Sequence, residues 1–171
     1  MYRFAQGTLA DLPRFYQLIS ARIAWMDQMG IRQWNTTDYW SVYPESHYEA
    51  LTERGEFYIL RRAQDGLLVA GAALYEQDPR WPDCTPPAFY VHHLTTDRAA
   101  AGAGRELLRR CEDLARRRGK VCLRLDCAVD NAPLNRYYEE QGYLFAGTCI
   151  DGAYSGNLRQ KLLVPPEDTA P

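Results

Sequence analysis

The stretch DRAAAGAGRELLRR, residues 97–110, is the feature that most constrains the fold. Alanines and two glycines, Gly102 and Gly104, precede a helix-forming segment with regularly spaced leucines. We call residues 97–104 the small-residue loop. The N-terminus of a helix presents unsatisfied backbone N–H groups and a partial positive charge. Small residues in front of it permit either a tight strand-to-helix turn or the close approach of an anion such as a phosphate. The loop alone leaves both possibilities open.

Composition favours one compact, soluble domain. The chain has 171 residues, is 46% hydrophobic and carries a net charge of −2. This is enough apolar material for a core, and no basic field indicates nucleic acid or an anionic membrane as a partner. No apolar run reaches the ~18 residues of a spanning helix, and the start does not resemble a secretory signal. We therefore expect a cytoplasmic protein whose single domain covers residues 1–164, followed by a flexible tail at 165–171.

The cysteines are odd in number and form no C-x-x-C pair. Disulfide frameworks usually have even counts in secreted chains, and zinc sites usually have clustered pairs. We expect these thiols to be buried as small hydrophobic groups, and we expect no metal site. The cysteines are Cys84, Cys111, Cys122, Cys127 and Cys149.

Apolar periodicity predicts a mixed sheet with flanking helices. Strands are expected at residues 1–7, 56–62, 67–77, 88–96, 120–128, 143–150 and 158–164. Helices are expected from Leu9 to about Gly30, over 45–54, after the small-residue loop as far as Gly119, and from a cap at Asn131 to Gly142. The early strands form an antiparallel meander, whereas a right-handed crossover makes strands 88–96 and 120–128 parallel. The predicted class is α/β (α+β), with a mostly antiparallel central sheet and one parallel pair.

Two common nucleotide-binding loops match this stretch poorly. A Walker loop requires Lys followed by Ser or Thr, which the sequence lacks here. A dinucleotide fingerprint fits Gly102 and Gly104 and places Asp126 near its acidic position, but Leu107 replaces the third glycine. The meander before the loop also differs from the repeated βα units of that fold.

Two motifs resemble the GNAT superfamily of N-acetyltransferases. LTTDRAAAGAGRELL follows one strand and resembles that family's acyl-CoA loop, [QR]-x-x-G-x-[GA]. After the next strand, the family's Asn…Tyr…Gly-Phe spacing is matched by Asn131, Tyr138, Gly142 and Tyr143. LRLDC (123–127) and GIRQW (30–34) also resemble one branch of the family. The resemblance covers nearly the whole chain in element order and residues 88–145 in motif detail.

The small-residue loop departs from the family pattern at one position. Gly102 and Gly104 align with the family glycines, which places Ala99 where Gln or Arg is usual. Arg98 stands one residue early, and Arg105 follows the second glycine. Backbone donors do not depend on the missing side chain. A side-chain charge for the phosphates would therefore come from Arg98 or Arg105.

The resemblance implies an acyl-CoA N-acyltransferase domain over residues 1–164, with acetyl-CoA as its co-substrate. In the family, the two parallel strands splay apart and the cofactor's amide arm pairs with the freed backbone. The N–H groups of residues 100–105 would hold the pyrophosphate. The implied cofactor-binding residues are Leu94, Thr95, Thr96, Arg98, Ala99, Ala100, Ala101, Gly102, Ala103, Gly104, Arg105, Asn131 and Tyr138.

Acetyl transfer to an amine requires a neutral amine, donors for the oxyanion and a proton for the leaving thiolate. The resemblance makes Tyr138 the general acid, although its spacing of four from Leu134 also fits a packed core aromatic. The general base is open among His92, His93, Asp126 and a water chain. In a regular strand His92 and His93 face opposite sides. We expect direct transfer in a ternary complex rather than through a covalent enzyme intermediate.

Residues 25–40, WMDQMGIRQWNTTDYW, are rich in tryptophan, tyrosine and methionine. Such surfaces suit small or aromatic ligands, so Trp25, Trp34 and Tyr39 are candidate contacts for the acceptor. A small hydrophobic core beneath a long loop explains the composition equally well. The predicted function is acetylation of a primary amine of a small molecule or peptide, with a non-catalytic acyl-CoA-binding regulatory domain as the alternative. An exposed terminal strand could pair two copies as a homodimer.

Overall fold

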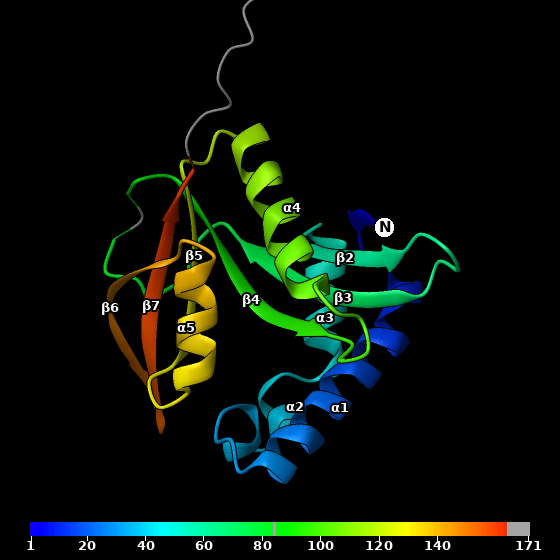
Figure 1. The fold of residues 1–171 in the computed structure, drawn as a ribbon, viewed down its shortest axis with the longest axis horizontal. Helices are drawn as coiled ribbons and strands as arrows, with labels where there is room; N and C mark the ends of the chain where they lie inside the picture. Colours follow the sequence, from blue (N-terminus) through cyan, green and yellow to red (C-terminus); the bar gives the residue numbers. More distant parts are fainter. Residues whose placement is uncertain (84, 164–171) are drawn as a thin grey trace, which may run out of the picture. The chain divides into compact units, whose positions relative to one another are not determined.

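The computed structural model describes residues 1–83 and 85–163, so the expectations for Cys84 and for the tail at 165–171 lie outside the described residues. Within them, the sheet has the strand order β1-β2-β3-β4-β5-β7-β6 (Figure 1). The strands are β1 (Tyr2–Gln6), β2 (Phe57–Arg62), β3 (Leu68–Tyr75), β4 (Ala88–Thr96), β5 (Cys122–Ala128), β6 (Leu144–Asp151) and β7 (Tyr154–Leu162).

The helices are α1 (Leu12–Met29), α2 (Tyr39–Val42), α3 (Glu45–Glu53), α4 (Ala103–Arg117) and α5 (Ala132–Glu140). Short 3₁₀ turns lie at Leu9–Asp11 and Trp34–Thr36. β2 pairs antiparallel with β1 and β3, and β7 pairs antiparallel with β5 and β6. β4 and β5 are parallel. The predicted mixed, mostly antiparallel sheet with one parallel pair is confirmed.

The chain divides into two compact units. The first contains residues 1–74 and 92–108, and the second contains residues 75–91 and the chain from residue 109 onward. β4 and α4 each run from one unit into the other. The expectation of one functional domain over residues 1–164 therefore stays a prediction.

In the first unit, α1 and α3 lie side by side and pack through aromatic rings (Figure 1). The buried ring of Phe15 on α1 has its centre 4.8 Å from that of Phe57 on β2 and 5.8 Å from that of Tyr48 on α3. Gly71 of β3 lies beneath the same ring, where an added Cβ would come within 2.7 Å of Phe15 Cε2. Phe15 thus lies on the face by which α1 packs against β2 and α3.

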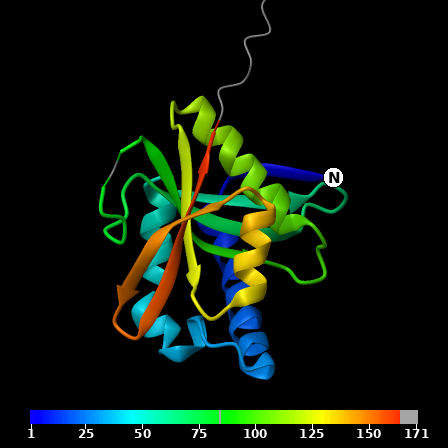
Figure 2. The ribbon, with the colours of Figure 1, turned by 60° about the vertical axis from the view of Figure 1, so that its left-hand side comes forward.

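In the second unit, α5 lies along β5 and β7 (Figure 2). β5 is buried along nearly its whole length, including Arg124, whose exposed fraction is 3%. The Arg124 guanidinium carbon lies 4.4 Å from the centre of the Trp81 ring, and Nη1 donates to the Tyr90 hydroxyl at 3.0 Å. A buried cation on this strand is therefore satisfied by aromatic and hydroxyl partners.

Two boundaries differ from the sequence expectations. β7 begins at Tyr154, four residues before the expected 158, because Gly156 pairs with both Ala128 and Cys149 despite its low strand propensity. The four-residue α2 was not expected, and it begins after Asp38, whose side chain accepts from the Ser41 N–H. The early start of β7 depends on strand pairing and α2 depends on a helix cap, and apolar periodicity reveals neither.

The cysteines and the helices agree with two further expectations. Cys111, Cys122, Cys127 and Cys149 are free and buried, and burial raises the pKa of the Cys127 thiol to about 11. These four are therefore packed thiols, as predicted. Among the described residues, no helix combines the length and the apolar character that a bilayer crossing would need.

Candidate functional site

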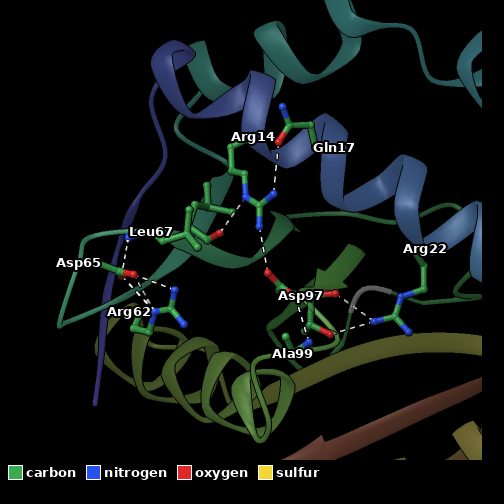
Figure 3. A network of polar contacts seen from close by, with 10 residues as sticks. Arg14, Gln17, Arg22, Arg62, Asp65, Leu67, Asp97 and Ala99 are labelled. Atoms are coloured by element: carbon green, nitrogen blue, oxygen red, sulfur yellow. Dashed lines mark hydrogen bonds and ion pairs between the residues drawn. The ribbon is translucent and has the colours of Figure 1, made fainter.

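Asp97 fixes the start of the small-residue loop (Figure 3). Its N–H donates to the Val69 carbonyl at 2.7 Å, and its carboxylate pairs with Arg14 Nη2 at 2.9 Å. The same carboxylate accepts from the Ala99 N–H at 2.9 Å. The loop therefore leaves β4 in a defined direction, held from β3, from α1 and by its own turn.

Two of the expected phosphate donors are used within this turn. Ala100 N–H donates to the Asp97 carbonyl at 3.0 Å, and Ala103 N–H donates to the Ala100 carbonyl at 3.1 Å. Gly102 has φ 78, a conformation that is costly for residues with a Cβ. In the described part of the chain, no hydrogen-bond acceptor meets the N–H groups of Ala101, Gly102, Gly104 and Arg105. The loop is thus a tight turn that still presents four open donors at the start of α4.

The last residues of β4 lie beyond its parallel pairing, whose register covers only Ala88 to Tyr90. Thr95 is fully buried, and its hydroxyl donates to the His93 carbonyl at 3.0 Å. Arg22 Nη2 donates to the Thr96 carbonyl at 3.1 Å and to its hydroxyl at 2.9 Å (Figure 3). Leu94 is half-buried. The side chains of Thr95 and Thr96 and the Thr96 carbonyl are therefore engaged by the protein.

His93 is held on both ring nitrogens. Nδ1 lies 3.0 Å from the Tyr39 hydroxyl and 3.3 Å from the Tyr48 hydroxyl, while Nε2 lies 3.3 Å from His47 Nε2. The two tyrosine hydroxyls are themselves 2.5 Å apart. His93 is 9% exposed. The structure thus makes His93 the centre of a buried polar cluster, which sequence reasoning did not anticipate because His47 and Tyr48 come from a distant helix.

The backbone at His93 departs from the regular strand on which the expected alternation of His92 and His93 depends. His93 has φ 54, outside the extended conformation that makes neighbouring side chains alternate. The ring centres of His92 and His93 are 6.1 Å apart. Burial, Arg54 and His92 lower the pKa of His47. The three histidines of the chain therefore lie close enough to influence one another's charge.

Of the three aromatic residues expected at the acceptor site, Trp34 and Tyr39 pack against each other. Tyr39 is 4% exposed, and its ring centre lies 5.3 Å from those of Trp34 and Tyr43. Trp34 and Trp25 are half-buried. The hydrophobic-core interpretation therefore describes Tyr39, whereas Trp34 and Trp25 each keep an accessible portion. Trp25 lies against two arginines, Arg22 and Arg98.

Asn131 and Tyr138 belong to the second unit. Asn131 caps α5 as predicted, its side chain accepting from the Leu134 N–H at 3.2 Å. Tyr138 is 6% exposed, and its ring centre lies 5.4 Å from that of Tyr137 and 6.0 Å from that of Tyr143. Tyr138 is therefore packed among aromatics, which is compatible with both a core role and a protected acid.

Asp126 already has two partners. Its Oδ1 lies 3.2 Å from Arg80 Nη1, and its Oδ2 accepts from the Tyr154 hydroxyl at 2.6 Å. Burial and the Asp126 charge raise the pKa of Tyr154, so this phenol stays a donor. A base must offer a lone pair to the proton that it removes. The contacts of Asp126 therefore weigh against that role.

Asn135 is a polar centre that sequence reasoning missed. Its Oδ1 accepts from Arg159 Nη2 at 2.8 Å and from Asn157 Nδ2 at 2.8 Å. Its Nδ2 donates to the carbonyls of Ala128 and Asn131, each at 2.9 Å. The spacing of four from Asn131 was the available signal, since it puts both amides on one face of the helix.

Comparison with known proteins decides the family. The family model described as "Acetyltransferase (GNAT) family" matches residues 18–143, which is more than half of the chain. The chain belongs to the GNAT acetyltransferase family. The resemblance inferred from the small-residue loop and from Asn131 and Tyr138 is thereby confirmed.

Solved structures of GNAT proteins share the fold. An acetyltransferase of the GNAT family from Listeria monocytogenes is 22% identical, with a TM-score of 0.76 and 95% of each chain covered. The PaiA N-acetyltransferase from Thermoplasma acidophilum, in complex with coenzyme A, is 16% identical, with a TM-score of 0.73 over 95% of this chain and 99% of that one. YncA from Salmonella typhimurium, with its cofactor acetyl-CoA, is 17% identical, with a TM-score of 0.69 over 100% of this chain and 98% of that one. No curated protein matches the chain.

The residues of the small-residue loop fit the phosphates of the GNAT co-substrate. Two open N–H groups precede α4 and two lie in its first turn, and an added Cβ at Gly102 would meet nothing within 4 Å. Arg98 and Arg105 are exposed on either side of these donors in the chain. Backbone donors, a helix N-terminus and cationic side chains are the usual groups that bind phosphate. The absence of Gln or Arg at position 99 therefore does not remove the anion-binding capacity.

Proposed function

We propose that this GNAT protein is an N-acetyltransferase that moves the acetyl group of acetyl-CoA to a primary amine of a small molecule or peptide. The observation that carries the proposal is the set of four open backbone donors at the start of α4. The family match and the CoA-bound and acetyl-CoA-bound neighbours of the same fold support it. We further propose direct transfer within a ternary complex.

The chain's own groups would act on three parts of the reaction. The N–H groups of Ala101, Gly102, Gly104 and Arg105 would bind the pyrophosphate, with Arg98 and Arg105 adding charge. The backbone of residues 94–96 would orient the amide arm and polarise the thioester carbonyl, which concentrates donors where negative charge develops. Acetyl-CoA supplies the activated thioester, so the protein needs to orient the acetyl group and to move protons.

Proton movement is assigned among the predicted groups. Tyr138 would donate a proton to the leaving thiolate. His93 and Asp126 have their proton-accepting atoms in contacts with other residues. We propose that the amine proton leaves through His92, whose ring centre lies 6.1 Å from that of His93, or through a water chain.

The acceptor and the acid are tested together by screening amines and peptides for release of free CoA thiol. With an active acceptor, Tyr138→Phe should lower kcat by about 10²-fold or more and leave the affinity for acetyl-CoA within about twofold, because only the transition state loses the proton donor. Tyr137→Phe, the neighbouring tyrosine on the same helix, is the matched control and should keep its turnover. Equal turnover in Tyr138→Phe and wild type would remove Tyr138 from the mechanism.

A non-catalytic acyl-CoA-binding domain is the second candidate. Two observations favour it: Ala99 stands at the first motif position, and both nitrogens of His93 are engaged. Both functions predict stabilisation by acetyl-CoA through ligand linkage. If acetyl-CoA stabilises the protein but free CoA thiol is released with no amine in a broad panel, the result would support the binding domain over the enzyme.

A further inference from the structure

Two guanidinium groups lie close to the indole ring of Trp25 on α1. The Arg98 guanidinium carbon lies 4.7 Å from the centre of the indole ring, and that of Arg22 lies 5.2 Å from it. Both distances fall within the ~6 Å range of cation–π attraction. The ring is half-buried, and it therefore offers a fixed surface to a cation that comes from the small-residue loop.

The two arginines differ in how they are held. Arg22 is tied to β4 through the carbonyl and hydroxyl of Thr96, at 3.1 and 2.9 Å. Arg98 is exposed, and no carboxylate of residues 1–83 or 85–163 forms a salt bridge with it. The adjacent Asp97 is paired with Arg14 at 2.9 Å. Arg98 therefore presents an uncompensated charge whose position is set by the indole.

We infer that Trp25 is a positioning residue for coenzyme A, holding Arg98 as the cation that this chain uses in place of the family side chain missing at Ala99. The inference rests on the proposed function, because the anion that it concerns is the cofactor's pyrophosphate. It also changes the role expected for Trp25, from an acceptor contact to a support for the cofactor loop.

The physical reason lies in the flexibility of an exposed arginine. Arg98 projects from a loop of alanines and glycines, so no neighbouring loop side chain confines its rotamers. Ordering such a side chain during binding costs affinity, and a ring that orders it beforehand reduces this cost. Arg22, whose guanidinium carbon lies 5.2 Å from the centre of the same ring, brings a second cationic group to this surface.

The test measures the affinity of the purified full chain for coenzyme A by calorimetry. Trp25→Leu should weaken binding by about three- to tenfold through loss of the stacked cation, and Trp25→Phe should recover most of the affinity because an aromatic face remains. Trp40→Leu removes another half-buried indole of the same unit and should leave the affinity unchanged. Thermal melts of each variant check that the fold is retained.

A double-mutant cycle separates positioning from general packing. Arg98→Ala should weaken binding by a similar factor and reduce its salt dependence, and adding Trp25→Leu to it should cause no further loss. The inference would be overturned if Trp25→Leu weakened coenzyme A binding equally with and without Arg98. It would also be overturned if Arg98→Ala, which does not disturb the core, bound coenzyme A with wild-type affinity. Absence of coenzyme A binding in the wild type is a distinct result that overturns the proposed function and this inference with it.

Discussion

Asn135 illustrates how a single buried amide can connect a helix to its strands. It accepts from Arg159 and Asn157 on β7 and donates to two carbonyls that precede or begin α5. Arg159 is only 3% exposed, so its charge depends on such partners. Tyr138, the proposed acid, lies one turn further along the same helix. The hydrogen bonds of Asn135 therefore also hold the part of α5 that carries Tyr138.

Asn135→Ala is expected to lower the free energy of unfolding by about 2–3 kcal/mol, because it leaves buried donors without an acceptor. Asn157→Ala removes one of these hydrogen bonds and should cost about 1 kcal/mol. Urea denaturation of the two variants measures both values. A loss in Asn135→Ala no greater than that in Asn157→Ala would show that Arg159 finds other partners.

Gly102 is the residue at which the small-residue loop depends on backbone conformation. With φ 78 and open space around its α-carbon, an alanine there would meet strain but no clash. Gly102→Ala should therefore cost about 1–2 kcal/mol of stability and weaken acetyl-CoA binding, whereas Gly102→Asn should cost less because asparagine tolerates the left-handed region. Chemical denaturation and calorimetry check both effects, and equal stability of Ala and Gly at this position would contradict the backbone account.

At the scale of elements, the segment from α2 to α3 contacts His93 of β4. Tyr39 belongs to α2 and Tyr48 and His47 belong to α3, and all three contact His93. Two imidazole nitrogens 3.3 Å apart can share one proton, while a second proton would place two positive charges in contact. Protonation should therefore weaken the attachment of this segment to β4.

The lowered pKa of His47 determines the direction in which stability changes with pH. Below an unfolded pKa of about 6.5, the unfolded chain takes up a proton that the folded chain resists, so stability falls as pH decreases. The melting temperature should drop between about pH 7 and 5.5, above the range in which most carboxylates titrate. His47→Gln should flatten this slope, whereas the control His92→Gln keeps the His47–His93 contact and most of the slope. An unchanged slope in His47→Gln would contradict the assignment.

Elements with local signals were predictable. The helix after the small-residue loop ends two residues before Gly119, whose φ is 70, and α5 begins after its predicted asparagine cap. Both ends were predictable because spacing and caps depend on neighbouring residues. The His47–His93 pair and the arginine bound to Asn135 were not predictable, since each joins residues more than twenty positions apart. The same limit explains why the candidate base could not be chosen from the sequence.

At the scale of the whole molecule, the family motif is divided between the two compact units. The small-residue loop belongs to the first unit, and Asn131 and Tyr138 belong to the second. The family model nevertheless spans residues of both units. The two separated motifs together therefore indicated the family, whereas the glycine pair of the small-residue loop alone did not. The sequence therefore predicted the family and the fold, whereas the partners of each site side chain required the structure.

The central claim, that the open donors at the start of α4 bind coenzyme A phosphates, is tested most directly by thermal unfolding with and without acetyl-CoA. At a concentration about 100-fold above its Kd, acetyl-CoA should stabilise the protein by about 2.7 kcal/mol, which for a chain of this size raises the melting temperature by about 5–10 °C. Inorganic pyrophosphate and acetate at the same concentration serve as controls for general anion effects. A melting temperature that does not change at millimolar acetyl-CoA would contradict the account.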